Sequence, residues 1–165
     1  VQRVNLRAPL GVYAVAGNID WRGRWSAIFA GQPVKLFEIS ESIDIGPFIL
    51  TGLTFEDSAN SVLEVRAREK YHVVLGHTPN FSRGEVEADL LIAGHTHGGQ
   101  VRLSALGPLL TLADVPRAWA AGLTEIAPGK TLVVSRGIGM EREQAPQLRF
   151  LCRPEIVILD LQPVE

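Results

Sequence analysis

Short apolar runs separated by polar segments recur along the first 100 residues, and they predict buried strands. The clearest are residues 11–16, 71–75 and 89–93, each dominated by apolar and β-branched side chains and followed directly by glycine. Continuous apolar runs of this length are typical of strands covered on both faces. Two further strands are expected at 34–39 and 43–53, joined as a meander whose second member contains a Gly-Pro step.

Apolar spacing and end signals predict two helices. The stronger candidate covers residues 55–70, where two carboxylates and a serine stand in the first turn and three cations stand in the last turn. This distribution of charge suits the helix dipole. A second helix is expected at 21–30, ended by Gly31 and Pro33.

After residue 100 the chain becomes rich in β-formers, with strands expected at 100–103, 118–126, 131–135 and 155–161. A turn is expected at 128–130, and an aperiodic, glycine-containing loop at 137–149. Strands alternate with helices at first and dominate later. This order favours a single α/β domain over residues 1–165, with a mixed sheet packed on helices.

The composition fits one globular domain and excludes several functional classes. The 165 residues are 46% apolar and 21% charged, which is enough to bury a core. The net charge of −2 gives no electrostatic basis for nucleic-acid binding. Cys152 is the sole cysteine, so an intrachain disulfide is excluded and a small packed side chain is expected. No apolar run approaches the roughly 18–20 residues that cross a bilayer.

Side chains that can bind metals follow three of the predicted strands in the same way. Asn18, His77 and His95 each come directly after the glycine that closes a strand. Ligands collect at the carboxyl ends of strands in open α/β sheets, so we expect these side chains to meet. His97 forms an H-x-H pair with His95, and the two glycines after it let the backbone turn both rings toward one metal or two neighbouring metals. Imidazole and amide-oxygen ligands together suit Zn, Fe or Mn.

Other polar residues have structural interpretations beside functional ones. Asn18 and His77, taken singly, could be turn or loop residues bonded to the backbone. His72 lies inside a predicted strand and is expected to be a buried or edge residue. Arg136 and Arg149 flank the 137–149 region and are candidates for holding a phosphate, with an ordinary surface role as the alternative.

These motifs resemble the calcineurin-like metallophosphoesterases. The residues that carry the resemblance are Gly17-Asn18-Ile19-Asp20, Gly76-His77 and Gly94-His95-Thr96-His97-Gly98-Gly99-Gln100. The longer G-H-T-H-G-G-Q form, followed by S-R-G-I-G at 135–139 and P-E-I at 154–156, is similar to the YkuE-type bacterial phosphohydrolases. The resemblance runs from about residue 11 to the end of the chain.

The resemblance implies an α/β/β/α sandwich, two central metal ions and phosphoesterase activity. Asn18, His77 and His95 would bind one metal, and His97 would help to bind the other. The metals would orient the phosphate, and a bridging hydroxide would attack phosphorus. The implied substrate is a phosphorylated small molecule or a phospholipid-like compound.

The chain departs from the family pattern in two ways. The early motifs D-x-H and G-D-x-x-D, which supply the remaining metal ligands, do not occur in residues 1–10, and the chain opens on Val1. We therefore expect the C-terminal lobe of a domain whose N-terminal part is missing, with at most one well-formed metal site and little or no activity alone. Ile19 stands where the family usually has a histidine, and isoleucine can neither donate a hydrogen bond nor transfer a proton. No catalytic residue is assigned.

Two other functional classes remain open at this point. Ile19 and the missing motifs favour a degenerate, non-catalytic metal-binding or scaffold module of the same fold. A metallo-β-lactamase-type hydrolase would also use an H-x-H pair, but it expects an Asp-His step where Gly98-Gly99-Gln100 follow here. An incomplete sandwich would expose sheet surface, so a homo-oligomer that covers it is expected. The compartment stays open between the bacterial cytoplasm and a membrane-associated or exported parent protein.

Overall fold

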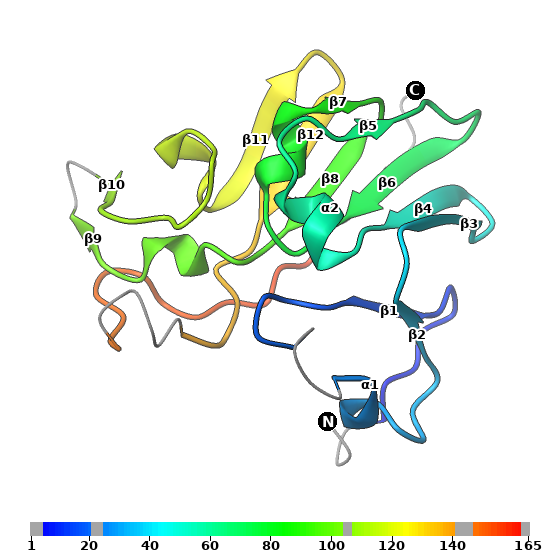
Figure 1. Cartoon of the computed structure of the whole chain (residues 1–165), viewed down its shortest axis with the longest axis horizontal. Helices are drawn as coiled ribbons and strands as arrows, with labels where there is room; N and C mark the ends of the chain where they lie inside the picture. The colour runs from blue at the N-terminus through cyan, green and yellow to red at the C-terminus, as the bar shows by residue number, and fades with distance from the viewer. Residues whose placement is uncertain (1–4, 21–24, 104–106, 141–146, 163–165) are drawn as a thin grey trace.

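A six-stranded mixed sheet forms the centre of an α/β fold in the computed structural model, which describes residues 5–20, 25–103, 107–140 and 147–162 (Figure 1). In spatial order its strands are β11 (Gly122–Ala127), β12 (Lys130–Val134), β8 (Leu90–Ala93), β6 (Tyr71–Leu75), β4 (Phe48–Gly52) and β3 (Glu41–Asp44). Within these ranges every helix is too short or too polar to cross a bilayer.

The remaining elements are short. Two-stranded sheets are formed by β1 (Val12–Val15) with β2 (Val34–Phe37), β5 (Glu64–Val65) with β7 (Glu85–Val86), and β9 (Arg102–Leu103) with β10 (Gly107–Pro108). The helices are α1 (Trp25–Ile28) and α2 (Phe55–Ala59), and 3₁₀ turns occur at Asn80–Arg83, His97–Gly99 and Arg117–Trp119. In Figure 1, β1, β2 and α1 lie below the six-stranded sheet, and β9 and β10 lie at its left.

The four inner strands β12, β8, β6 and β4 are mutually parallel, and the outer strands β11 and β3 are antiparallel to their neighbours. All four parallel strands therefore end at the same edge of the sheet. Main-chain hydrogen bonds continue past that edge, from the Gly76 amide to the Ile92 carbonyl and from the Gly94 amide to the His77 carbonyl. The segments after β6 and β8 are thereby fixed to each other.

Both faces of the sheet are covered. On one face, Val74, Leu91 and Leu132 pack with Phe81 and Val86 from the connections after β6. On the other face, a core that includes Leu50, Val73 and Val133 packs against Tyr13 and Val15 of β1, Phe37 of β2, and Leu159. The continuous apolar runs of the inner strands follow from this double coverage, and the packing of β1 on the second face brings the residues after β1 near the same edge.

The sequence-based prediction of a helix at 55–70 is wrong beyond its first turn. α2 ends at Ala59, and β5 then pairs with β7. The Asn60 side-chain oxygen accepts a hydrogen bond from the Val62 amide, a local turn that competes with helix continuation. Val62 is 82% exposed, so the apolar positions of this stretch do not form one buried stripe.

The predicted 34–53 meander is also corrected. β2 pairs in parallel with β1 and belongs to a different sheet from β3 and β4. The 43–53 run is divided at Gly46, whose φ of +95° makes the turn of a β3–β4 hairpin. Whether the 34–39 run forms a meander or joins β1 depends on which strands pair, and the paired strands are separated in the sequence.

Several other predictions can be compared with the described residues. The strands at 71–75, 89–93 and 131–135 are confirmed within one residue, and so is the turn before β12. The run 118–126 is divided between a 3₁₀ turn and β11, and residues 155–161 form no strand.

The helix predicted at 21–30 is reduced to α1, and its first four positions lie outside the described residues. The 137–149 loop is non-regular where it is described, and positions 141–146 lie outside.

Candidate metal centre

The structure brings together the three side chains that follow β1, β6 and β8. Oδ1 of Asn18 lies 3.0 Å from Nε2 of His77, and Nδ1 of His95 lies 3.2 Å from the same nitrogen. These residues are 59 and 18 positions apart from His77 in the sequence. The convergence expected from the strand-end pattern is therefore present as side-chain contact, although the role of each residue stays a prediction.

The orientation of His95 is set by a second contact on the other side of its ring. Nε2 of His95 lies 2.9 Å from the carbonyl oxygen of Leu112. A carbonyl can only accept, so Nε2 carries the proton and the lone pair of Nδ1 is directed at His77. Metal-binding histidines commonly donate their remote N–H to a backbone carbonyl in this way. No sequence signal indicated Leu112.

The donor atoms have the spacing that a shared cation requires. Two ligands bound to one metal at the usual roughly 2.0–2.1 Å lie about 2.8–3.4 Å apart when they subtend 90–110°. The separations of 3.0 and 3.2 Å fall in this range. In the described part of the chain no cluster of three or more His, Cys, Asp or Glu side chains could hold a metal, and the group found here consists of two histidines and one amide. Its donors fit a divalent first-row metal.

His77 is held as a neutral imidazole. Burial, together with the charges of the neighbouring His95 and His97, lowers its pKa from 6.5 to about 4. Phe55, at the start of α2, lies against the ring with a centroid distance of 6.0 Å. On another side the backbone of Gly17 is so close that an added Cβ would stand 2.6 Å from Cε1 of His77. A neutral ring with an available lone pair is the form that binds metals.

The G-H-T-H-G-G-Q segment has an unusual backbone. His95, His97 and Gln100 have φ values of 65°, 47° and 49°, and the intervening Gly98 and Gly99 have 63° and 81°. Left-handed conformations at non-glycine residues cost about 1–3 kcal/mol each and concentrate at functional sites. Thr96 stabilises the turn because its hydroxyl donates to the Ala120 carbonyl and accepts from the Gly98 amide.

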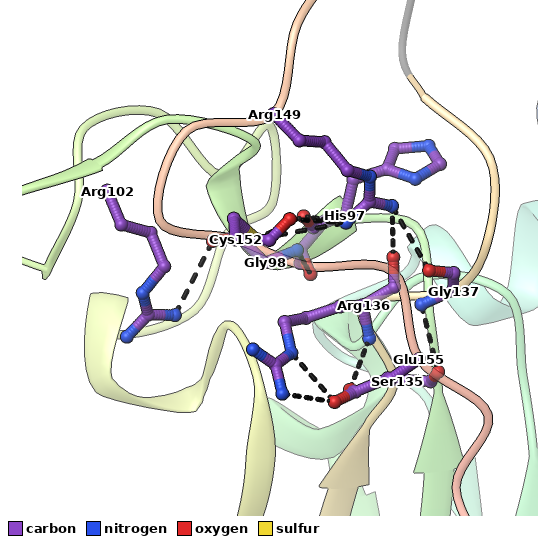
Figure 2. Close-up of polar contacts among 10 residues, drawn as sticks. His97, Gly98, Arg102, Ser135, Arg136, Gly137, Arg149, Cys152 and Glu155 are labelled. Carbon is purple, nitrogen blue, oxygen red and sulfur yellow. Dashed lines mark hydrogen bonds and ion pairs between the residues drawn. The ribbon is translucent and has the colours of Figure 1, made fainter.

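His97 lies beside this cluster but makes a different set of contacts. A positive charge on His97 lowers the pKa of His77, so the two rings are near enough to interact. Its carbonyl oxygen accepts from Cys152 Sγ at 3.2 Å and lies 3.4 Å from a guanidinium nitrogen of Arg149 (Figure 2). The H-x-H pattern indicated the His97 imidazole as a candidate ligand. No sequence pattern indicated these contacts of the His97 carbonyl.

The two candidate phosphate-binding arginines are engaged within the protein. Arg136 donates to Glu155 through its backbone amide at 2.8 Å and through Nε at 2.7 Å, as Figure 2 shows. The hydrogen bonds to Glu155 raise the pKa of Arg136 and lower the pKa of Glu155. Arg149 donates to main-chain carbonyls, including those of Arg136 and Gly137. Their role toward a phosphate stays a prediction.

Three further residues singled out from the sequence are His72, Cys152 and Ile19, and the structure gives the exposure of each. His72 is 1% exposed and bonds to Thr51 and to the Glu87 carbonyl, so its assignment as a buried residue is confirmed. Cys152 is also buried and unpaired, as expected. Ile19, which follows Asn18 directly, is 58% exposed.

The known proteins to which this chain is similar are named as metallophosphoesterases or as a phosphodiesterase. An uncharacterized metallophosphoesterase of Aquifex aeolicus is 28% identical over 171 residues, covering 95% of this chain and 63% of the relative. YkuE of Bacillus subtilis, also an uncharacterized metallophosphoesterase, is 28% identical over 176 residues, covering 95% and 58%. The phosphodiesterase YaeI of Escherichia coli is 34% identical over 92 residues, covering 54% and 32%. No family model matches the chain, and no solved structure matches it significantly.

The chain spans little more than half the length of the first two of these relatives. Both alignments cover nearly all of this chain, including the segments that hold Asn18, His77 and His95. The likeness therefore concerns the whole of this chain and a part of each relative.

Proposed function

Because the chain is similar to metallophosphoesterases over nearly its whole length, we propose that it contributes a divalent-metal site to a phosphoric-ester hydrolase. The observation that carries the proposal is the meeting of Asn18, His77 and His95 with His95 locked in one tautomer by Leu112. The substrates proposed for the whole protein are phosphorylated small molecules or phospholipid-like compounds. The architecture proposed for it is an α/β/β/α sandwich to which β1 and β2 contribute.

The chemistry assigned to these side chains is binding and orientation. Asn18 would supply an amide oxygen, and His77 and His95 would supply one ring nitrogen each. A divalent metal held there supplies Lewis-acid polarisation of a phosphoryl oxygen and lowers the pKa of bound water. The chemistry of these donors suits Mn, Fe or Zn. His97 is proposed as a ligand of a second metal, for which the described residues offer no further carboxylate or histidine cluster.

Proton transfer to a leaving group has no donor at the position after Asn18. Ile19 is exposed there, and its side chain holds no titratable proton. Loss of a general acid typically reduces the rate by 10²–10⁴-fold, a rough range. We therefore propose that this chain alone binds one metal well and turns over phosphoesters slowly or not at all.

A direct metal-binding experiment tests this function. The full chain is titrated with Mn²⁺ and Zn²⁺ by calorimetry, and the bound ion is located by anomalous diffraction. One ion at His77 and His95 is expected, and Asn18→Ala, His77→Ala and His95→Ala should each weaken binding by about 10–100-fold or more. Asn60→Ala, an exposed asparagine at the end of α2, is the matched control and should bind normally. Absence of binding, or an ion bound elsewhere, would refute the proposal.

A non-catalytic metal-binding or scaffold module is the second candidate function, and the exposed Ile19 is the observation that favours it. The two candidates differ in the response to Ile19→His. In an impaired enzyme this variant should raise phosphodiesterase turnover on bis-p-nitrophenyl phosphate, because a proton donor is restored. In a scaffold module it should leave turnover at background while metal binding is retained. Two tightly bound ions per chain with rapid wild-type turnover would contradict both candidates.

We also propose that the chain self-associates. Ile156 and Ile158 are 83% and 91% exposed on the 155–161 segment, whose sequence favours a strand. An extended apolar segment of this kind can pair with another chain. Small-angle scattering should show a dimer or larger species that Ile158→Glu dissociates. A monodisperse monomer would contradict this proposal without affecting the metal site.

A further inference from the structure

The guanidinium of Arg149 is surrounded by main-chain carbonyl oxygens. Its NH2 nitrogen lies 2.7 Å from the carbonyl oxygen of Arg136 and 3.2 Å from that of Gly137, and Nε lies 3.1 Å from that of Gly139. NH1 reaches the carbonyl oxygens of Cys152 at 3.3 Å and His97 at 3.4 Å. One side chain thus ties three segments together: the turn at 97, the loop at 136–139 and the segment at 149–152 (Figure 2).

Cys152 supports the same carbonyl from a second direction. Its thiol donates to the His97 carbonyl at 3.2 Å and lies 3.6 Å from the Gly98 carbonyl. The thiol is 1% exposed and packs tightly on the turn, because a Cβ added to Gly98 would stand 2.8 Å from Sγ. The His97 carbonyl therefore has a cationic and a neutral donor, both from residues more than 50 positions further along the chain.

These contacts act on a backbone that does not hold its conformation unaided. His97 has a φ of 47°, in the left-handed region that residues with a Cβ seldom adopt. The direction of its carbonyl fixes the 97–98 peptide plane and, with φ, the direction in which the imidazole leaves the backbone. Donors that hold the carbonyl thus hold the Cα–Cβ bond from which the ring extends, much as outer contacts orient metal-binding side chains.

We propose that Arg149, assisted by Cys152, is a positioning residue that fixes the imidazole of His97 beside the His77–His95 cluster. The positioning itself is a property of this chain without metal. Its consequence for metal binding rests on the proposed function. Arg149 acts here through backbone carbonyls, and its role requires the forked donors of a guanidinium, which a lysine ammonium supplies only in part.

Histidine NMR tests the positioning directly. The full chain is labelled with ¹³C-histidine, and the four imidazole Cε1–Hε1 signals are recorded with a chelator present in wild type, Arg149→Met, Arg149→Lys and Cys152→Ala. The signal of His97 should shift and broaden in Arg149→Met, and less in Arg149→Lys and Cys152→Ala. The signal of His72, bonded to Thr51 and Glu87, should stay unchanged. Arg153→Met removes an exposed arginine four positions away and should leave all four signals unchanged.

Metal affinity supplies the second readout. The dissociation constant for Mn²⁺ should rise about tenfold in Arg149→Met and stay within twofold in Arg153→Met. An unchanged His97 signal in both Arg149→Met and Arg149→Lys overturns the positioning role. Equal disturbance of His72, or an equal effect of Arg153→Met, overturns it as well, because either would indicate a general loss of structure. If wild type binds no metal while the His97 signal still depends on Arg149, the proposed function fails and the positioning role stands.

Discussion

The carbonyl oxygen of Leu112 lies 2.9 Å from Nε2 of His95, and this contact turns the other ring nitrogen toward His77. Leu112 itself has a φ of 53°, an uncommon value for a leucine. A conformation of this kind persists where surrounding contacts require it. A residue without any side-chain chemistry thereby decides which nitrogen of His95 faces the candidate metal centre.

Gly17→Ala should disrupt the candidate centre. An added Cβ would lie 2.6 Å from Cε1 and 2.9 Å from Nδ1 of His77, and an aromatic ring confined by Phe55 cannot give way easily. Overpacking of this kind typically costs about 1–3 kcal/mol. We expect a loss of unfolding free energy in urea titrations and a weaker Mn²⁺ affinity in calorimetry.

Gly94→Ala is the matched control for this substitution. Gly94 precedes His95 as Gly17 precedes Asn18, yet its added Cβ would lie 3.9 Å from the His77 carbonyl oxygen and 4.0 Å from the Ser135 carbonyl oxygen, which are ordinary contact distances. Stability and Mn²⁺ affinity should therefore stay close to those of wild type. Equal effects of the two substitutions would show that the contact between Gly17 and His77 is not what fixes the ring.

The stability of the metal-free chain should fall as the pH is lowered from about 6.5 to about 4. The pKa of His77 is lowered to about 4 by burial and by its histidine neighbours, whereas in the unfolded chain it returns to about 6.5. The unfolded state therefore binds more protons in this window, and stability falls with falling pH. The contribution is at most about 3–4 kcal/mol, and it becomes constant below the folded-state pKa.

Urea unfolding at pH 7.5, 6.0 and 5.0 measures this dependence. His77→Asn removes the titrating ring and should flatten the slope. The slope that remains in the variant should have the same sign, because burial also lowers the pKa of His72. An identical pH dependence in wild type and His77→Asn would contradict the assignment.

Thr51→Val should destabilise the chain by about 1–3 kcal/mol. Nδ1 of His72 donates to the Glu87 carbonyl at 3.1 Å, so Nε2 accepts from the Thr51 hydroxyl at 2.7 Å. Valine has nearly the same shape but leaves the buried nitrogen without a partner, and that penalty exceeds the worth of an ordinary hydrogen bond. Thr51→Ser keeps the hydroxyl and should recover most of the stability in urea titrations.

Glu155→Gln should also reduce stability, by about 1–3 kcal/mol. The carboxylate accepts from the Arg136 amide and guanidinium, and the two side chains are 20% and 34% exposed. The exposed pair of Glu64 and Arg66, 3.5 Å apart, is the comparison, and Glu64→Gln should change stability by less than about 0.5 kcal/mol. Thermal unfolding of both variants measures the two losses of stability. Similar losses would show that burial does not distinguish these pairs.

Local residue pattern predicted the inner strands and the candidate ligands. β6 and β8 are continuous apolar runs because both of their faces are covered, so nearly every residue of these strands must be apolar. Asn18, His77 and His95 were indicated because each follows a strand-closing glycine. The parallel strands β6 and β8 end at one edge of the sheet, so the repeated pattern implied that His77 and His95 meet. Asn18 follows β1, which belongs to another sheet and reaches the same edge by packing on the second face.

Tertiary structure decided what depends on distant partners. The helix expected at 55–70 ends at Ala59, and β5 then pairs with β7, whose residues lie 21 positions later. The 34–39 run joins β1 instead of the following strand. The Leu112 and Arg149 contacts are of the same kind, since they use backbone carbonyls that every residue possesses. A carbonyl carries no sequence signature, so only the folded chain shows which one orients His95 and which donors hold His97.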